Sequence, residues 1–146
     1  MARLINRFSL TIDDKGRLVL PTQYRRPFDD VGGGVLAPWD RCVGLWPRDM
    51  FGDVMVKLQT KVEEGEADPD VARLFQSAAW DVQLDTQGRF VLPTEHRDHA
   101  GIAEREVKVI GHTNRIEIWD AARFAAMQNR QSADDVSAAI GRLRIF

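Results

Sequence analysis

The sequence predicts a mainly β protein with short helices, an α+β fold in which two tandem copies of one small unit share a barrel-like, pseudo-dimeric core. The first observation is an internal repeat: the segment Asp13–Arg25 returns as Asp85–Arg97 with eight of thirteen positions identical. The second is that stretches of alternating apolar and polar residues, typical of half-buried strands, recur in both copies. Because a unit of about 50 residues buries too little surface to be stable alone, we expect the copies to pair their strands.

The repeat also defines the expected organisation of the chain. Asp13–Arg25 recurs 72 residues later, whereas Leu45–Phe51 matches Ile118–Phe124, 73 residues later. The difference of one residue indicates a single insertion between the two matches. We expect a first unit with its following helix over 1–65, a helical connector over 66–79, a second unit over 80–131 and a C-terminal tail over 132–146.

In the first copy, Phe8–Ile12 alternates apolar and polar residues and predicts a strand. Gly16 can adopt a positive φ, so a tight turn is expected there, followed by a returning strand over Leu18–Leu20. Pro21 ends that strand because proline cannot donate to a central ladder, and a short helix is expected to run through Arg26.

The second copy and the connections follow the same pattern. The other predicted strands are Trp80–Leu84, Phe90–Leu92, Val35–Ala37, Val107–Ile110, Cys42–Trp46 and Arg115–Trp119. The other predicted helices are one ending near Ala100, one from Pro47 to about Val62, one over Val71–Ala78, one beginning at the N-cap Asp120, and a helical start to the tail. Glu63–Pro69 is a polar break.

Composition favours a cytoplasmic protein. No run of about 18 apolar residues predicts a membrane span, and the basic N-terminus lacks the apolar core of a signal peptide. The single cysteine, Cys42, excludes an internal disulfide and is expected to be a small buried hydrophobe.

The distribution of charge favours a polyanionic partner more than the net charge of −2 does. Residues 1–27 hold six basic and two acidic side chains, whereas residues 28–70 hold four basic and ten acidic ones. The basic front end surrounds the first of the two repeated loops.

The repeated Gly-Arg loop is the candidate site. Arg17 and Arg89 each follow a turn glycine and are expected at a solvent-facing hairpin tip. Each arginine could pair with the repeated Asp13 or Asp85, or contact DNA, and the two interpretations are compatible because such an ion pair would fix the guanidinium.

The two loops differ in charge. Lys15-Gly16-Arg17 carries two positive charges, whereas the second loop has Gln87 in place of lysine. A two-stranded ribbon fits the DNA major groove, where arginine can bind a guanine edge, and Lys15 suits a phosphate. The basic residues expected to support the first loop are Arg3, Arg7, Arg25 and Arg26.

The doubled Asp-x-Lys-Gly-Arg and Asp-x-Gln-Gly-Arg pattern, with a proline four residues after each arginine, resembles the MraZ family of bacterial regulators of the division and cell-wall gene cluster. The resemblance spans nearly the whole chain and includes Leu45-Trp46-Pro47, Ile118-Trp119-Asp120 and Arg73–Ala79. One position departs from it, since Asn6 stands where the family has glycine.

The resemblance implies a tandem swapped-hairpin AbrB-like fold, a ring-shaped homo-oligomer (octamer or larger) and binding to short direct repeats of double-stranded promoter DNA. It further implies a repressor that acts on that gene cluster, including its own gene, in association with the nucleoid. The predicted DNA-binding residues are Lys15, Gly16, Arg17, Arg7 and Arg89.

Other functions remain as alternatives. His96 and His99, with Asp85 and Glu95 nearby, make a poor metal set, and no nucleotide-binding or nucleophile motif is present. We therefore predict no catalytic residue, metal, cofactor, small-molecule substrate or membrane partner. The rivals are an oligomeric scaffold that binds a partner through the acidic segment 63–70, and an AbrB-type antitoxin, which typically holds one copy. A polyanion-binding assay separates the enzyme and scaffold interpretations from the DNA interpretation.

Overall fold

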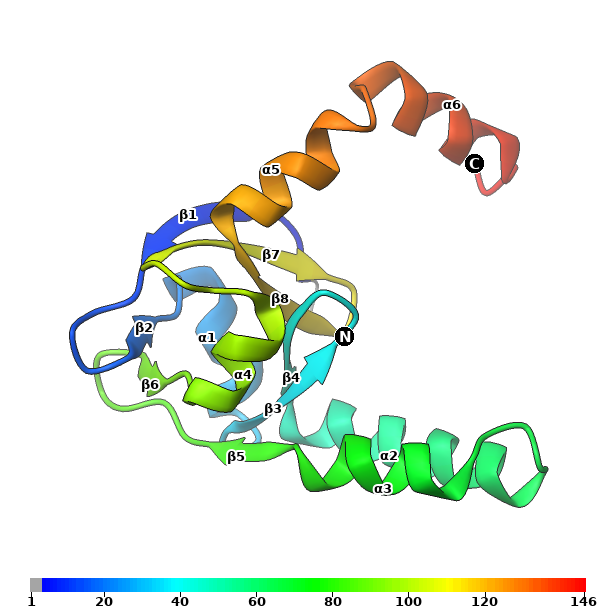
Figure 1. Cartoon of the computed structure of the whole chain (residues 1–146), viewed down its shortest axis with the longest axis horizontal. Helices are drawn as coiled ribbons and strands as arrows, with labels where there is room; N and C mark the ends of the chain where they lie inside the picture. The colour runs from blue at the N-terminus through cyan, green and yellow to red at the C-terminus, as the bar shows by residue number, and fades with distance from the viewer. Residues whose placement is uncertain (1–3) are drawn as a thin grey trace.

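The computed structural model describes residues 4–146, whose strands form two antiparallel sheets (Figure 1). The larger sheet has the order β1-β7-β8-β4-β3-β5, and the smaller is a ribbon of β2 and β6. The strands are β1 Arg7–Thr11, β2 Arg17–Val19, β3 Gly34–Trp39, β4 Cys42–Pro47, β5 Trp80–Val82, β6 Arg89–Val91, β7 Glu106–His112 and β8 Arg115–Asp120.

The two copies interleave. The first strand of each copy pairs with the third strand of the other, as β1 with β7 and β5 with β3. The equivalent strands β4 and β8 pair with each other, and so do β2 and β6. The pairings therefore obey a pseudo-two-fold relation, and the prediction that the copies share one set of strands in an α+β fold is confirmed.

Two finer expectations are wrong. The returning strand β2 does not pair with β1 to make a hairpin, because its hydrogen bonds go to β6 of the other copy. The strands described here also do not close into a barrel, because β1 and β5 remain edges of the six-stranded sheet while the ribbon is a separate sheet.

Residues 4–146 contain the six helices that the sequence predicted, each close to its predicted position. They are α1 Thr22–Asp29, α2 Arg48–Glu63, α3 Pro69–Ser77, α4 Thr94–Ala100, α5 Ala121–Asn129 and α6 Ala133–Arg142. Asp120 caps α5, since its carboxylate accepts a hydrogen bond from the Arg123 backbone N–H at 3.0 Å. Asp68 caps α3 in the same way, and Pro69 occupies the first turn, where a missing N–H does no harm.

The main core lies between the ribbon, α1 and the six-stranded sheet. Leu18 and Phe90 of the ribbon are buried in it together with residues of both copies. Cys42 is also fully buried, and burial raises the pKa of its thiol, so the expected small hydrophobe is confirmed. Asn6, at the position that departs from the family pattern, has φ 77°, a left-handed conformation that asparagine tolerates as glycine does.

Two helical arms extend from the body on the side away from the ribbon (Figure 1). In the first arm, α3 packs along α2, and the ring of Phe51 lies 5.4 Å from that of Trp46 and 6.0 Å from that of Phe75. The second arm consists of α5 and α6, and no residue of α6 is buried.

Phe51→Ala is expected to destabilise the protein by about 3–5 kcal/mol, because it removes a ring that is 2% exposed and leaves a cavity between α2, α3 and the sheet. Chemical denaturation followed by tryptophan fluorescence would measure the change. Val56→Ala is the matched control on α2, since Val56 is 68% exposed and its loss should change the free energy of unfolding little.

The stability of the protein is expected to fall as the pH drops below about 6.5. His96 is buried, neither of its ring nitrogens has a hydrogen-bond partner within residues 4–146, and burial lowers its pKa. The unfolded chain therefore takes up this proton at a higher pH than the folded protein does, so acid favours unfolding.

Thermal unfolding between pH 7.5 and 5.5 would measure this dependence. His96→Tyr, which places the residue of the equivalent position Tyr24, should flatten the Tm profile, whereas His99→Gln should leave it unchanged. A wild-type Tm that stays constant over this range would contradict the prediction. The lowered pKa values of Asp13 and Asp85 act only at more acidic pH.

Candidate nucleic-acid interface

The β2–β6 ribbon separates its side chains onto two faces. Leu18 and Phe90 form the central pair and point into the core, where they are 1% and 4% exposed. Because side chains alternate along a strand, the residues on either side of this pair point outward. The outward residues are Arg17, Val19, Arg89 and Val91.

The turn before β2 holds Arg17 in a fixed pose. The Asp13 carboxylate accepts hydrogen bonds from the Lys15 N–H at 2.9 Å, the Arg17 N–H at 2.8 Å and the Arg17 Nε at 2.7 Å. The bond from the Arg17 backbone N–H is the main reason why the pKa of Asp13 lies below its usual value. Gly16 has φ +77°, as the sequence predicted.

The second turn repeats this geometry. Asp85 accepts hydrogen bonds from the Gln87 N–H at 2.9 Å, the Arg89 N–H at 2.8 Å and the Arg89 Nε at 2.7 Å. The Arg89 backbone N–H likewise lowers the pKa of Asp85. The predicted Asp–Arg ion pairs are therefore confirmed in both copies.

Both arginines keep part of their binding capacity. Each ion pair uses Nε, and no acceptor within residues 4–146 binds the Nη atoms of Arg17 or Arg89. Each side chain is 31% exposed. An arginine held through Nε can still present its Nη groups to a base edge or a phosphate.

The two turns lie at opposite ends of the ribbon. The Leu92 N–H donates to the Gly16 carbonyl and the Leu20 N–H to the Gly88 carbonyl, both at 2.9 Å. Arg17 faces Val91 across the ribbon, and Arg89 faces Val19. Arg17 and Arg89 are therefore diagonal neighbours across the ribbon, a relation in which long side chains are within reach of each other.

Two further arginines join this surface. Arg25 lies against the turn of the other copy, because a Cβ on Gly88 would collide with its guanidinium. Arg97 occupies the equivalent place, with Nη2 3.6 Å from where a Gly16 Cβ would stand. Arg25 was expected to support the first loop, but the exchange between copies places it against the second; Arg3, expected beside the first loop as well, lies outside the described residues. Arg97 was not among the predicted site residues, although it fills the last identical position of the repeat, which was the signal for it.

The resulting surface carries one arginine beside one valine at each end of the ribbon. Its residues, called the ribbon face below, are Lys15, Arg17, Val19, Arg25, Arg89, Val91 and Arg97. Val19 and Val91 are 46% and 52% exposed, which is high for valines in a strand.

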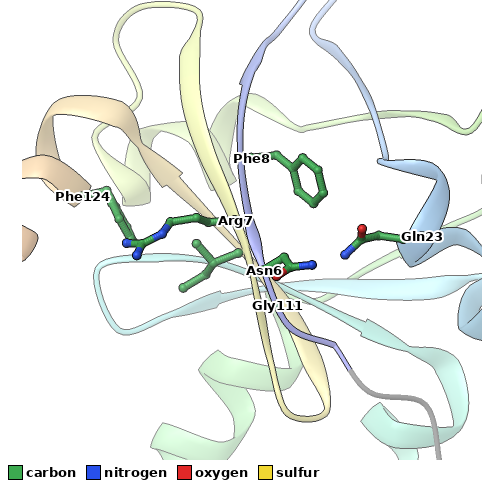
Figure 2. A pocket seen from close by; sticks show the side chains of 7 residues that line it. Asn6, Arg7, Phe8, Gln23, Gly111 and Phe124 are labelled. Carbon is green, nitrogen blue, oxygen red and sulfur yellow. The ribbon is translucent and has the colours of Figure 1, made fainter. Parts of the chain in front are cut away.

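Arg7 does not join the ribbon face. It lies on β1 and lines an open pocket of about 600 Å³ with Asn6, Gly111 and Phe124. Figure 2 shows its side chain extending toward Phe124 of α5, on the other side of β1 from Phe8. The structure thus brings together four of the five predicted residues and places Arg7 elsewhere.

The histidines do not form a metal site in the described part of the chain. His96 is buried, whereas His99 is exposed, with its Nε2 2.9 Å from the Asp40 carbonyl oxygen. No group of three or more His, Cys, Asp or Glu residues within 4–146 could hold a metal ion. None of the helices described is long and apolar enough to cross a membrane.

Comparison with known proteins identifies similar chains. The family model described as "MraZ protein, putative antitoxin-like" matches residues 75–143. A relative from Thermomicrobium roseum, named Transcriptional regulator MraZ, is 39% identical over 140 residues, which are 92% of this chain and 94% of the relative. Relatives of the same name from Frankia alni and Alcanivorax borkumensis are 37% and 36% identical, covering 82% and 80% of this chain and 82% of each relative.

Proposed function

The chain belongs to the MraZ family, and from this we propose that it is a sequence-specific DNA-binding transcriptional regulator rather than an enzyme. The ribbon face is the observation that supports this proposal most. It displays the guanidinium groups of two diagonally neighbouring arginines on an element of the right size for the major groove.

The roles of the ribbon residues follow from their chemistry. Arg17 and Arg89 present Nη donors that suit the two acceptors of a guanine edge. Lys15 lies at the exposed tip of the first turn and suits a phosphate. Arg25 and Arg97 add positive charge behind the two turns and attract the DNA backbone.

Multivalency would supply the affinity that one ribbon lacks. We propose a ring-shaped homo-oligomer, an octamer or larger, whose subunits bind short direct repeats in the promoter of the gene's own operon. Once one ribbon is bound, each later contact is intramolecular and therefore favoured. In this role the protein would act as a repressor of the division and cell-wall cluster, in the cytoplasm and on the nucleoid.

The interleaved pairing also supports a finer fold assignment. We propose that the exchange of first strands between copies is the swapped-hairpin arrangement of a pseudo-dimer. The units of duplication would then be 1–65 and 80–131, with 66–79 as the connector and 132–146 as the tail.

Fluorescence anisotropy with labelled DNA from upstream of this gene tests the proposal. We expect tight binding to that fragment and binding weaker by about 1,000-fold or more to a shuffled fragment of equal length. Equal affinity for both fragments would refute sequence specificity, and no binding to either would refute the DNA-binding role.

A further inference from the structure

Helix α6 carries an apolar stripe that nothing in residues 4–146 covers. Val136, Ala139, Ile140 and Leu143 follow helical spacing along one side. Val136 is 47% exposed, Ile140 37% and Leu143 63%, although the helix is capped by a complete capping box at Ser132. In Figure 1, α6 projects beyond the end of α5, away from the sheet.

The pseudo-two-fold relation shows where such a helix fits. In the first copy, α3 packs on Phe51 of α2 through Phe75, with Ala79 beside it. Phe124 of α5 is the equivalent of Phe51 in the repeat. Strand pairing makes Ser9 equivalent to Asp81, so Arg7 is the equivalent of Ala79.

The equivalent place in the second copy is the pocket of Figure 2. Arg7, Ile110 and Phe124 line it, together with Gln23 of α1. A second hollow of about 350 Å³ continues along β1 and β7 and includes Lys108 and Phe124. We call these two hollows the α5 groove. In the first copy, Phe75 of α3 fills the position of the first hollow, whereas in the second copy this position is open. The position of the second hollow is open in both copies, since a hollow of about 290 Å³ lies against Val35 and Phe51.

We propose that α6 of a second copy of this chain docks in the α5 groove and so links subunits head to tail. The buried Ala72, together with Phe75 and Ala79 that pack against the cluster of Phe51, has the same spacing as Val136, Ala139 and Leu143 in and just after α6. The contact joins two different surfaces, so repetition of it builds a ring or a filament.

Charge favours the same occupant. The first turn of α6 carries Asp134 and Asp135, whereas the α5 groove is lined by two basic side chains, Arg7 and Lys108, and one acidic side chain, Glu106. Docking in cis is disfavoured by the connection, because only residues 130–132 separate α5 from α6, and α6 lies beyond the end of α5 that is farther from the sheet (Figure 1). The inference rests on the proposed oligomer and specifies which surfaces join it.

Sedimentation velocity of full-length variants tests this contact. Val136→Lys with Ile140→Lys should weaken self-association on the order of 100-fold, because two aliphatic side chains can no longer be buried. Ser137→Lys with Ala138→Lys adds the same charge on the other side of α6 and should leave the oligomer unchanged. Gln23→Trp should block the α5 groove, whereas Gln23→Ala should not.

A mixing experiment distinguishes docking in trans from docking in cis. The Val136→Lys, Ile140→Lys chain keeps an intact groove, and the Gln23→Trp chain keeps an intact α6. Each alone should be monomeric, and their mixture should form a complex of one chain of each and nothing larger. Absence of that complex overturns the inference.

The controls separate this inference from the proposed function. If the wild type is oligomeric and the α6 variant keeps the same size, α6 docking is wrong and the ring proposal stands. If the wild type is monomeric at all concentrations, both the docking and the ring are wrong. Circular dichroism of each variant shows that loss of assembly is not loss of folding.

Discussion

Arg17→Ala is expected to weaken binding to the upstream DNA by on the order of 100-fold or more, with the oligomer intact. One arginine–guanine contact contributes about 1–3 kcal/mol of discrimination, and an assembly loses it in every bound subunit. The substitution leaves Leu18 and the core unchanged, because the Arg17 side chain lies on the outer face of the ribbon. Fluorescence anisotropy gives the affinity and sedimentation velocity the assembly.

Two comparisons make this prediction specific. Arg89→Ala should weaken binding less, by about 10-fold, because the second turn carries Gln87 where the first has Lys15. Arg73→Ala, which removes an exposed arginine of α3 paired with Asp70, should leave the affinity unchanged. An Arg17→Ala protein that binds as tightly as the wild type would refute the assignment of the ribbon face.

The affinity for DNA is also expected to fall by about 10³–10⁵-fold between 50 and 200 mM salt. If about four subunits each neutralise two phosphates, about eight counterions are released on binding, and the logarithm of the affinity falls steeply with that of the salt concentration. Titrations at four or more salt concentrations, with one DNA fragment, would give the slope.

Part of the dependence of DNA affinity on salt concentration can be assigned to Lys15. Lys15→Gln makes the first turn like the second, and it should reduce the slope by about one unit for each subunit that binds. A nearly flat salt response in the wild type would show that phosphate contacts do not hold the complex, and would contradict the multivalent model.

The local structure could be predicted because its signals are local. Gly16 and Gly88 mark turns that need a positive φ, and Asp13 and Asp85 lie four residues before the arginines that they bind. The strand ends at proline and the capped helix start at Asp120 are likewise decided by neighbouring residues. The turns and the ion pairs were predicted correctly for both copies, and the side-chain cap at Asp120 for the second copy.

The pairing of strands could not be predicted from local signals. Alternation in Leu18–Leu20 shows that one face of the strand is buried, but it does not say whether β1 or β6 is the partner. For this reason the predicted hairpin of β1 and β2 and the predicted closed barrel were both wrong. Arg25 and Arg97 each contact the turn of the other copy because of the same exchange of strands. The repeat in the sequence shows that these two arginines are equivalent, but it does not show which turn each of them contacts.

Fusing the two halves of the ribbon into one polypeptide frees each half to evolve by itself. A true homodimer would change both ends with every mutation and would remain suited to inverted, palindromic sites. Here a lysine at one end and a glutamine at the other give the ribbon a direction. A DNA-binding ribbon whose two ends differ can distinguish the two orientations of an operator. Sites repeated in tandem with the same orientation require this property.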